Sequence, residues 1–280
     1  MFLRALRRRA DAEIDGAFPW SVPVLRALER FSFDAPVTFL MGENGCGKST
    51  LLEALAVKVE AVAVGAQDVE ADSTLAGSRR LAAAFDAVYA RRPQTRLFFR
   101  AEDAFGFTRR VERDMRGIDE EADAILGDER AGLSARKRAA GFVRGQKRQL
   151  ARRYGDDPHA RSHGETFLGL LRARVGAPGL YLLDEPETPL SPTRVLALLA
   201  LLREAVDGGS QFVIATHSPI LAAFPAASIR VFAGERITET PYDELEHVRV
   251  TRDFLNAPGR WLRALERSAA ADPGDAGDAQ

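Results

Sequence analysis

Nine consecutive residues have the types and spacing that a loop needs to hold the phosphates of a nucleotide. They are Gly42, Glu43, Asn44, Gly45, Cys46, Gly47, Lys48, Ser49 and Thr50, and the first eight fit the pattern G-x-x-x-x-G-K-[ST]. Glycines let backbone N–H groups turn toward phosphates, and the following helix presents its positive N-terminal end to them. The pattern predicts that Lys48 reaches the β- and γ-phosphates of ATP and that the Ser49 hydroxyl ligates Mg²⁺.

The composition and the flanking residues argue against a chance match to this loop. The chain has 39 Lys and Arg residues, of which only four are Lys, and Lys48 occupies the required position. An apolar run at 37–41 precedes the loop, and residues 49–60 have the pattern of a helix. Cys46 is either a tolerated small residue or, beside Lys48 and a helix N-terminus, a thiol whose oxidation would affect ATP binding.

A second segment with candidate catalytic residues is an apolar strand, 180–183, that is followed by Asp184 and Glu185. Adjacent residues on a strand point to opposite faces, so the two acids would have separate tasks. We expect Asp184 to hold the Mg²⁺ shell and Glu185 to polarise the water that attacks the γ-phosphate. Alternatively, the two acids are simply solvated at the end of a strand. The preceding phosphate loop and the fully apolar strand argue against this alternative.

His217 follows another apolar strand, 212–215. Ligands of open α/β sheets bind at the carboxyl ends of strands, where this histidine would lie. It is a candidate γ-phosphate sensor, and the alternative is a turn histidine that bonds to backbone.

The elements that must position these residues alternate between strand and helix. Apolar strands are predicted at 37–41, 96–100, 180–183 and 212–215, and a helix is predicted at 193–206. This order predicts an α/β fold of the P-loop NTPase class, with a mostly parallel sheet flanked by helices. We expect one domain, 1–267, with a charged helical insert at about 103–160, and a disordered tail at 268–280.

Composition limits the partners and the compartment. The net charge is −1, Cys46 is the only cysteine, and no run approaches the roughly 20 apolar residues of a membrane span. No apolar run follows the N-terminal arginines, which argues against a signal peptide. We expect a soluble, cytoplasmic protein without a membrane partner.

The insert has an uneven charge distribution. Residues 131–155 carry eight basic and no acidic residues, and an acidic run at 119–129 precedes them. In one interpretation, the acidic and basic segments face each other or are simply solvated. In the other, the basic segment contacts nucleic acid and neutralises its phosphates.

Several short segments, in this order, resemble the ABC-type branch of P-loop ATPases, and most closely the bacterial stand-alone ATPases labelled as AAA family. The segment S-H-G-E-T-F at 162–167 carries the resemblance, together with F-P-W-S-V-P at 18–23, F-F-R-A-E at 98–102, D-E-P-E at 184–187, L-S-P at 190–192 and T-R-D-F-L at 251–255. The resemblance covers nearly the whole chain, except parts of the insert and the tail.

The resemblance implies roles for residues whose pattern alone is weak. Ser162, Gly164 and Glu165 would belong to a signature segment that contacts the γ-phosphate bound by a second subunit, and 190–192 would cross the dimer interface. Glu102 would lie near the Mg²⁺, and either Phe18 or Trp20 would stack on adenine. His163 departs from the usual signature glycine, and Glu102 replaces a usual amide. Without the family, 162–167 still predicts a helix N-cap, which is itself an anion site.

The sequence therefore predicts an ATPase that requires ATP and Mg²⁺ and works as an ATP-bridged homodimer, in which hydrolysis is coupled to opening. The alternative is an ATP-gated module that binds DNA or protein and has little turnover of its own.

Overall fold

The computed structural model describes residues 1–64, 75–128, 130, 132–154 and 163–271. The chain divides into two compact units, Met1–Glu239 and Thr240–Gln280. Within the second unit, helix α10 (Pro258–Ala271) includes 268–271, which were expected to begin a disordered tail, and 272–280 lie outside the described residues. The limits of the predicted domain and insert stay predictions.

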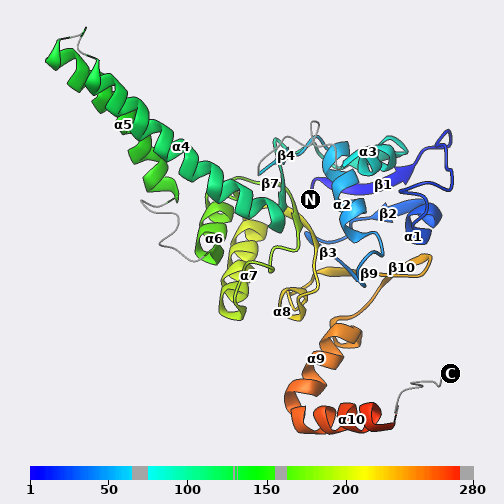
Figure 1. Ribbon diagram of the computed structural model, residues 1–280. Helices are drawn as coiled ribbons and strands as arrows, with labels where there is room; N and C mark the ends of the chain where they lie inside the picture. Colours follow the sequence, from blue (N-terminus) through cyan, green and yellow to red (C-terminus); the bar gives the residue numbers. More distant parts are fainter. Residues whose placement is uncertain (65–74, 129, 131, 155–162, 272–280) are drawn as a thin grey trace, which may run out of the picture. The chain divides into compact units, whose positions relative to one another are not determined.

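A seven-stranded sheet forms the centre of the first unit, in the order β10-β9-β3-β8-β7-β6-β4 (Figure 1). Its strands are β3 (Val37–Gly42), β4 (Val62–Ala63), β6 (Thr95–Arg100), β7 (Gly179–Asp184), β8 (Gln211–Ala215), β9 (Ser228–Ala233) and β10 (Arg236–Glu239). Neighbouring strands are parallel, except that β10 is antiparallel to β9. Every residue of β3 and β8 is buried, as expected when helices cover both faces of a parallel sheet. The predicted α/β fold with a mostly parallel sheet is confirmed.

A second, antiparallel sheet has the order β2-β1-β5 and was not predicted from the sequence. Its strands are β1 (Leu3–Arg8), β2 (Arg30–Ser32) and β5 (Phe85–Tyr89). Gln211 at the start of β8 joins the two sheets. Its Oε1 accepts the N–H groups of Phe2 at 2.8 Å and Leu3 at 2.9 Å, and its Nε2 donates to the Leu3 carbonyl at 2.9 Å.

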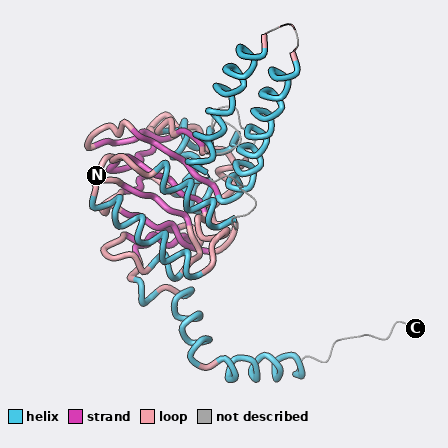
Figure 2. The backbone as a smooth tube through the Cα atoms, turned by 90° about the vertical axis from the view of Figure 1, so that its left-hand side faces the viewer, coloured by secondary structure: helices cyan, strands magenta, loops and turns pink. Residues whose placement is uncertain are grey.

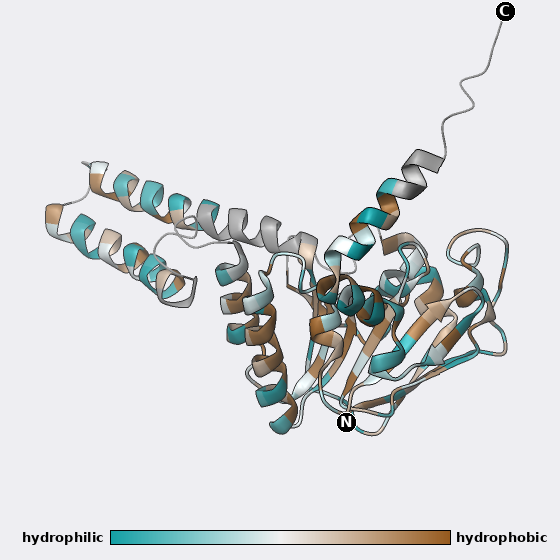
Figure 3. Ribbon diagram, turned by 90° about the horizontal axis from the view of Figure 1, so that it is seen from below, coloured by the Kyte–Doolittle hydropathy of each residue, from teal (hydrophilic) through white to brown (hydrophobic). Residues whose placement is uncertain are grey.

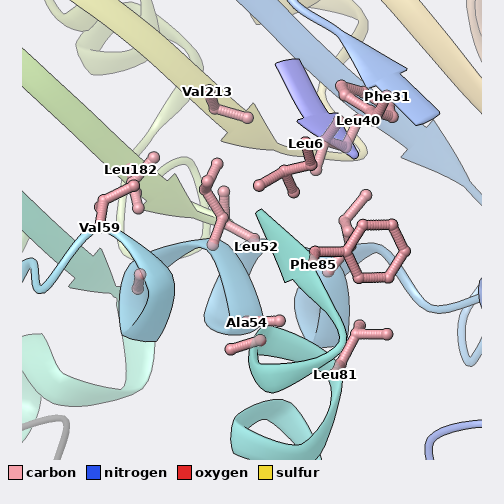
Figure 4. Close-up of a cluster of buried hydrophobic side chains, with 14 of the residues drawn as sticks. Leu6, Phe31, Leu40, Leu52, Ala54, Val59, Leu81, Phe85, Leu182 and Val213 are labelled. Carbon is pink, nitrogen blue, oxygen red and sulfur yellow. The ribbon is translucent and has the colours of Figure 1, made fainter. Parts of the chain in front are cut away.

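Helices complete the first unit. They are α1 (Pro23–Ala27), α2 (Lys48–Lys58), α3 (Ala76–Ala83), α4 (Ala101–Gly127), α5 (Leu133–Tyr154), α6 (His163–Arg174), α7 (Pro192–Asp207) and α8 (Pro219–Ala222). Figure 4 shows Leu52 of α2 among Leu182 and Val213 of the main sheet and Leu6 of the small sheet. One hydrophobic core therefore fixes the helix behind the phosphate loop against both sheets.

Helices α4 and α5 run side by side as a hairpin (Figure 2). A small apolar cluster of Ala122, Ala140 and Val143 joins them, and both helices mix hydrophobic and hydrophilic residues (Figure 3). No helix among the described residues is long and apolar enough to cross a membrane.

The second unit begins with a short 3₁₀ turn, Tyr242–Glu244, and contains helices α9 (Glu246–Asn256) and α10. Arg252 of α9 donates to Asp243 of the turn at 2.8 Å, and Val248 is buried.

Gln211→Ala tests the connection between the two sheets. The substitution leaves two buried N–H groups and one carbonyl without their partner, so we expect the free energy of unfolding to fall by about 2–4 kcal/mol. Denaturant unfolding measures this loss. Gln149→Ala, at an exposed position of α5, is the control and should change stability by less than about 0.5 kcal/mol. An equal effect of both substitutions would contradict the structural role of Gln211.

Candidate nucleotide-binding site

The register of the main sheet brings three predicted site segments to the same edge. Asp184, the last residue of β7, pairs with Ala215, the last residue of β8, and Leu40 of β3 pairs with that same Ala215. The phosphate loop therefore begins beside the ends of β7 and β8. Carboxyl ends of parallel strands are where open α/β sheets bind ligands.

The phosphate loop leaves β3 at Gly42 and enters α2 at Lys48, so it has the strand–loop–helix form that the pattern requires. Gly42 has φ 140°, and a Cβ there would lie 2.5 Å from the Phe232 carbonyl oxygen of β9. Gly47 has φ 100°, and a Cβ there would lie 3.1 Å from side-chain carbons of both Val22 and Leu25. Both glycines are required by close packing and by a left-handed backbone.

Lys48 points back into the loop and is 5% exposed. Its ammonium donates to the carbonyls of Gly42 at 2.8 Å and Glu43 at 2.7 Å, and lies 3.8 Å from the Cys46 sulfur. Glu43 is itself exposed at the turn of the loop. Two backbone carbonyls thus hold the positive charge of Lys48 inside the loop.

Ser49 and Asp184 are 135 residues apart in sequence and meet at the start of α2. The Ser49 hydroxyl donates to Asp184 Oδ1 at 3.1 Å. Burial is the main reason why the pKa of Asp184 is raised to about 7, and the nearby charges of Glu53 and Glu185 add to the rise. The Ser49 hydrogen bond and the charge of Arg100 oppose it.

Glu53 and Arg100 lie near Asp184, and sequence reasoning missed both. Arg100, the last residue of β6, pairs with Asp184 in the sheet register, and its guanidinium lies 3.7 Å from Glu53 Oε1. The hydroxyl of Ser78, a buried residue of α3, donates to Glu53 Oε2 at 2.7 Å. Glu53 lies one helical turn after Ser49, which is the signal that could have suggested its place near the site.

Glu185 and His217 approach each other across the ends of β7 and β8. His217 Nε2 lies 4.0 Å from Glu185 Oε1, and both side chains are partly exposed. Glu185 has φ 47°, a left-handed conformation that is uncommon for a residue other than glycine. Its N–H donates to the Ala215 carbonyl at 2.9 Å, which fixes this turn to β8. The two predicted catalytic residues are thus brought together.

Glu187 also belongs to this cluster, although sequence reasoning gave it no role. Its carboxylate accepts hydrogen bonds from Thr216 and from the His217 backbone. Burial raises its pKa, and these hydrogen bonds oppose the rise. Nothing in the local sequence reveals this contact, because its partners lie about 30 residues further along the chain.

The predicted signature segment is only partly described. Ser162 and the side chain of Glu102 lie outside the described residues, so their predicted roles stay predictions. Gly164 lies against the start of the loop at 190–192 that was expected to cross a dimer interface, since a Cβ there would be 2.7 Å from the carbonyl oxygen of the preceding Pro189 and 3.3 Å from Leu190 Cδ2. Glu165 accepts a hydrogen bond from Arg194 of α7. These contacts join the start of α6 to that loop and to α7.

The two candidate adenine-stacking residues differ sharply in exposure. Trp20 is 1% exposed and belongs to the hydrophobic core, whereas Phe18 is 50% exposed. The burial of Trp20 leaves no ring face for adenine and argues against its predicted nucleotide-binding role. The Phe18 ring lies over Gly77, and Arg80 of α3 donates to the Phe18 carbonyl at 2.7 Å. Only Phe18 of the pair presents a ring to solvent.

The fold and the site together define a P-loop nucleotide-binding protein. The sequence model of the family described as ABC transporter matches residues 32–188, and the model of a family described as an AAA domain matches residues 166–223. The chain therefore belongs to the ABC transporter family, as an ABC-type P-loop ATPase. This confirms the resemblance to ABC-type P-loop ATPases, while the closer resemblance to stand-alone ATPases stays a prediction.

Two relatives, from Streptomyces coelicolor and Streptomyces avermitilis, share the name "Putative ABC transporter ATP-binding protein". The first is 32% identical over 224 residues, which are 79% of this chain and 36% of that protein. The second is 30% identical over 256 residues, which are 88% and 41%. The chain thus spans well under half of their lengths. A solved ATP-binding subunit of an ABC transporter superposes with a TM-score of 0.43 at 18% identity, over 86% of this chain and 91% of that one.

Asp184→Asn tests how much the ionised Asp184 carboxylate lowers the free energy of unfolding. The unfolded carboxyl loses its proton near pH 4, but the folded one keeps it to about pH 7, so the stability of the folded state falls as pH rises between these values. Asparagine never ionises and still accepts from Ser49. Without metal or nucleotide, we expect the variant to be more stable by up to about 4 kcal/mol at pH 8, and by much less at pH 5. Denaturant unfolding at both pH values measures this, and a gain that does not depend on pH would contradict it.

Proposed function

We propose that this chain binds MgATP and hydrolyses it within an ATP-bridged homodimer, which opens when the γ-phosphate contacts are lost. The observation that carries the proposal is the convergence of Lys48, the Ser49–Asp184 pair and the Glu185–His217 pair on one edge of a parallel sheet. Together they match the requirements of phosphoryl transfer to water. Lys48 would neutralise charge and the Ser49–Asp184 pair would bind the metal, while Glu185 would activate the water and His217 would sense the phosphate.

In this proposal the residues act in sequence on the bound nucleotide. Lys48 and the loop N–H groups hold the β- and γ-phosphates. Glu185 accepts a proton from the attacking water in line with the γ-phosphate. His217, 4.0 Å from Glu185, donates to a γ-phosphate oxygen and so orients that phosphate toward the water.

The residues present also fit Mg²⁺, which prefers oxygen ligands and binds through one or two protein groups together with substrate phosphates. Ser49 and Asp184 supply a hydroxyl and a carboxylate oxygen that already lie 3.1 Å apart. Burial of Asp184, whose pKa is raised to about 7, marks a carboxylate that a cation would stabilise. Bound Mg²⁺ would neutralise charge that develops on the phosphates.

Support for the second subunit comes from family membership. In a homodimer the signature segment, Ser162, Gly164 and Glu165, would contact the γ-phosphate held by the other subunit. An ATP-gated binding module is the rival function. Clear basal hydrolysis by the pure protein favours the ATPase, whereas tight ATP binding with almost no turnover favours the module.

A nucleic-acid role for the basic segment 131–155 has less support. Arg144 donates to Asp123 at 2.9 Å, and Lys147 pairs with Asp119, so two cations of α5 already have carboxylate partners on α4. These pairs favour the alternative in which the acidic and basic segments face each other. Binding of nucleic acid through this segment stays a hypothesis.

Glu185→Gln tests the homodimer. The change removes the base but keeps the shape of the side chain, so the state before hydrolysis should persist with MgATP. We expect the solution mass, measured by light scattering, to double with MgATP and to return to that of the monomer with MgADP. The double variant Lys48→Ala, Glu185→Gln is the control and should stay monomeric, because it lacks the phosphate contact. A monomer under all conditions would contradict an ATP-bridged homodimer.

Phe18→Ala tests the adenine contact. Stacking of a base on an aromatic ring is worth about 1–3 kcal/mol, so we expect ATP affinity to fall about 5- to 150-fold. Inorganic triphosphate has no base, and its affinity should not change. Isothermal titration of both ligands separates loss of stacking from damage to the phosphate loop. Equal losses for both ligands would show that Phe18 acts on the fold and not on the base.

A further inference from the structure

Glu187 holds the loop that carries His217 through a single carboxylate oxygen. Its Oε1 accepts the Thr216 hydroxyl at 2.6 Å and the His217 N–H at 2.9 Å. The Thr216 oxygen in turn accepts the Ser218 N–H at 2.9 Å. Three consecutive residues are therefore tied to one oxygen, directly or through one hydroxyl. These hydrogen bonds fix the backbone of 216–218. They therefore also fix the direction of the Cα–Cβ bond of His217, which carries the imidazole.

Backbone hydrogen bonds also order the turn that contains Glu185 and Glu187. The Thr188 N–H donates to the Glu185 carbonyl at 3.0 Å, and the Leu190 N–H donates to the Glu187 carbonyl at 2.8 Å. Residues 185–190 thus form a hydrogen-bonded turn that contains both acids. Any displacement of Glu187 would move the two catalytic candidates relative to each other.

The second oxygen of Glu187 shows that this arrangement has a cost. Glu187 Oε2 is buried and has no hydrogen-bond partner among the described residues. A buried polar atom without a partner destabilises the fold. An apolar residue at this position would avoid that cost, but it would offer no acceptor to Thr216 and His217.

We propose that Glu187 is a positioning residue that sets the placement of the His217 imidazole relative to Glu185. This inference rests on the proposed function, in which Glu185 is the base and His217 the sensor. Glu187 itself contacts neither water nor nucleotide in this scheme. It acts through the backbone of the loop after β8.

Turnover kinetics give the first test. Glu187→Ala removes the acceptor, and because a displacement of about 1 Å can cost about 100-fold in rate, we expect kcat to fall about 10- to 100-fold. ATP affinity should stay near that of the unchanged protein, since Lys48 and the phosphate loop are intact. Glu187→Gln keeps an oxygen at the Oε1 position and should recover most of kcat. Glu204→Ala, which removes an exposed acid of α7, is the control and should leave kcat unchanged.

Imidazole signals give a second test that needs no turnover. The chain has four histidines, and His217→Gln identifies the signal of His217 in the NMR spectrum of histidine-labelled protein. We expect Glu187→Ala to shift or broaden that signal alone, and Glu187→Gln to leave it near its original position. Should Glu187→Ala fail to fold, Thr216→Val, which removes one of the two donors at nearly constant volume, replaces it and should shift the same signal.

The two tests separate failure of this inference from failure of the proposed function. An unchanged His217 signal in folded Glu187→Ala overturns the positioning role, whatever the turnover. An equal loss of kcat in Glu187→Ala and Glu187→Gln also overturns the positioning role, because the loss would then not depend on the acceptor oxygen that glutamine keeps. If the protein without substitutions shows no ATP turnover, the proposed ATPase function is wrong. The imidazole signals still decide whether Glu187 positions His217.

Discussion

The crowding of carboxylates at one edge of the main sheet is the constraint on which the rest of the site depends. Asp184, Glu185 and Glu187 lie within four consecutive residues, and Glu53 of α2 is close enough to raise the pKa of Asp184. Buried like charges oppose ionisation of one another and destabilise the folded state. A fold that keeps them together must supply a different partner to each, and the surrounding elements are arranged to do so.

Those partners separate the acids into different environments. Asp184 is partly buried and accepts a hydrogen bond from the Ser49 hydroxyl, whereas the Glu185 side chain is 43% exposed. Glu187 accepts its hydrogen bonds from the loop after β8. Asp184, with one donor, is suited to bind a cation, the more exposed Glu185 to activate a water, and Glu187, with two donors, to hold a loop. Adjacent residues of the same chemical type thereby acquire separate tasks.

The sequence was most informative where one continuous segment carries the signal. The apolar runs that became β3, β7 and β8 and the phosphate loop are local patterns, so their order predicted the parallel sheet and the site edge. The small antiparallel sheet was missed, because β1 mixes arginines with apolar residues and its pairing with β5 contains a register shift. The burial of Trp20 and the bonds of Glu187 depend on distant residues, which no local pattern contains.

The left-handed backbone at Glu185 shows how the site is kept rigid. A φ of 47° at a residue with a side chain costs roughly 1–3 kcal/mol and persists only where its surroundings fix it. Here the Glu185 N–H is held by Ala215 of β8, and its carbonyl is held by Thr188. The backbone at Glu185 therefore cannot change conformation without breaking hydrogen bonds to the sheet or within the turn. If the proposed ATP-bridged dimer opens as we infer, we expect whole elements to move while the backbone of Glu185 and its turn keeps its conformation.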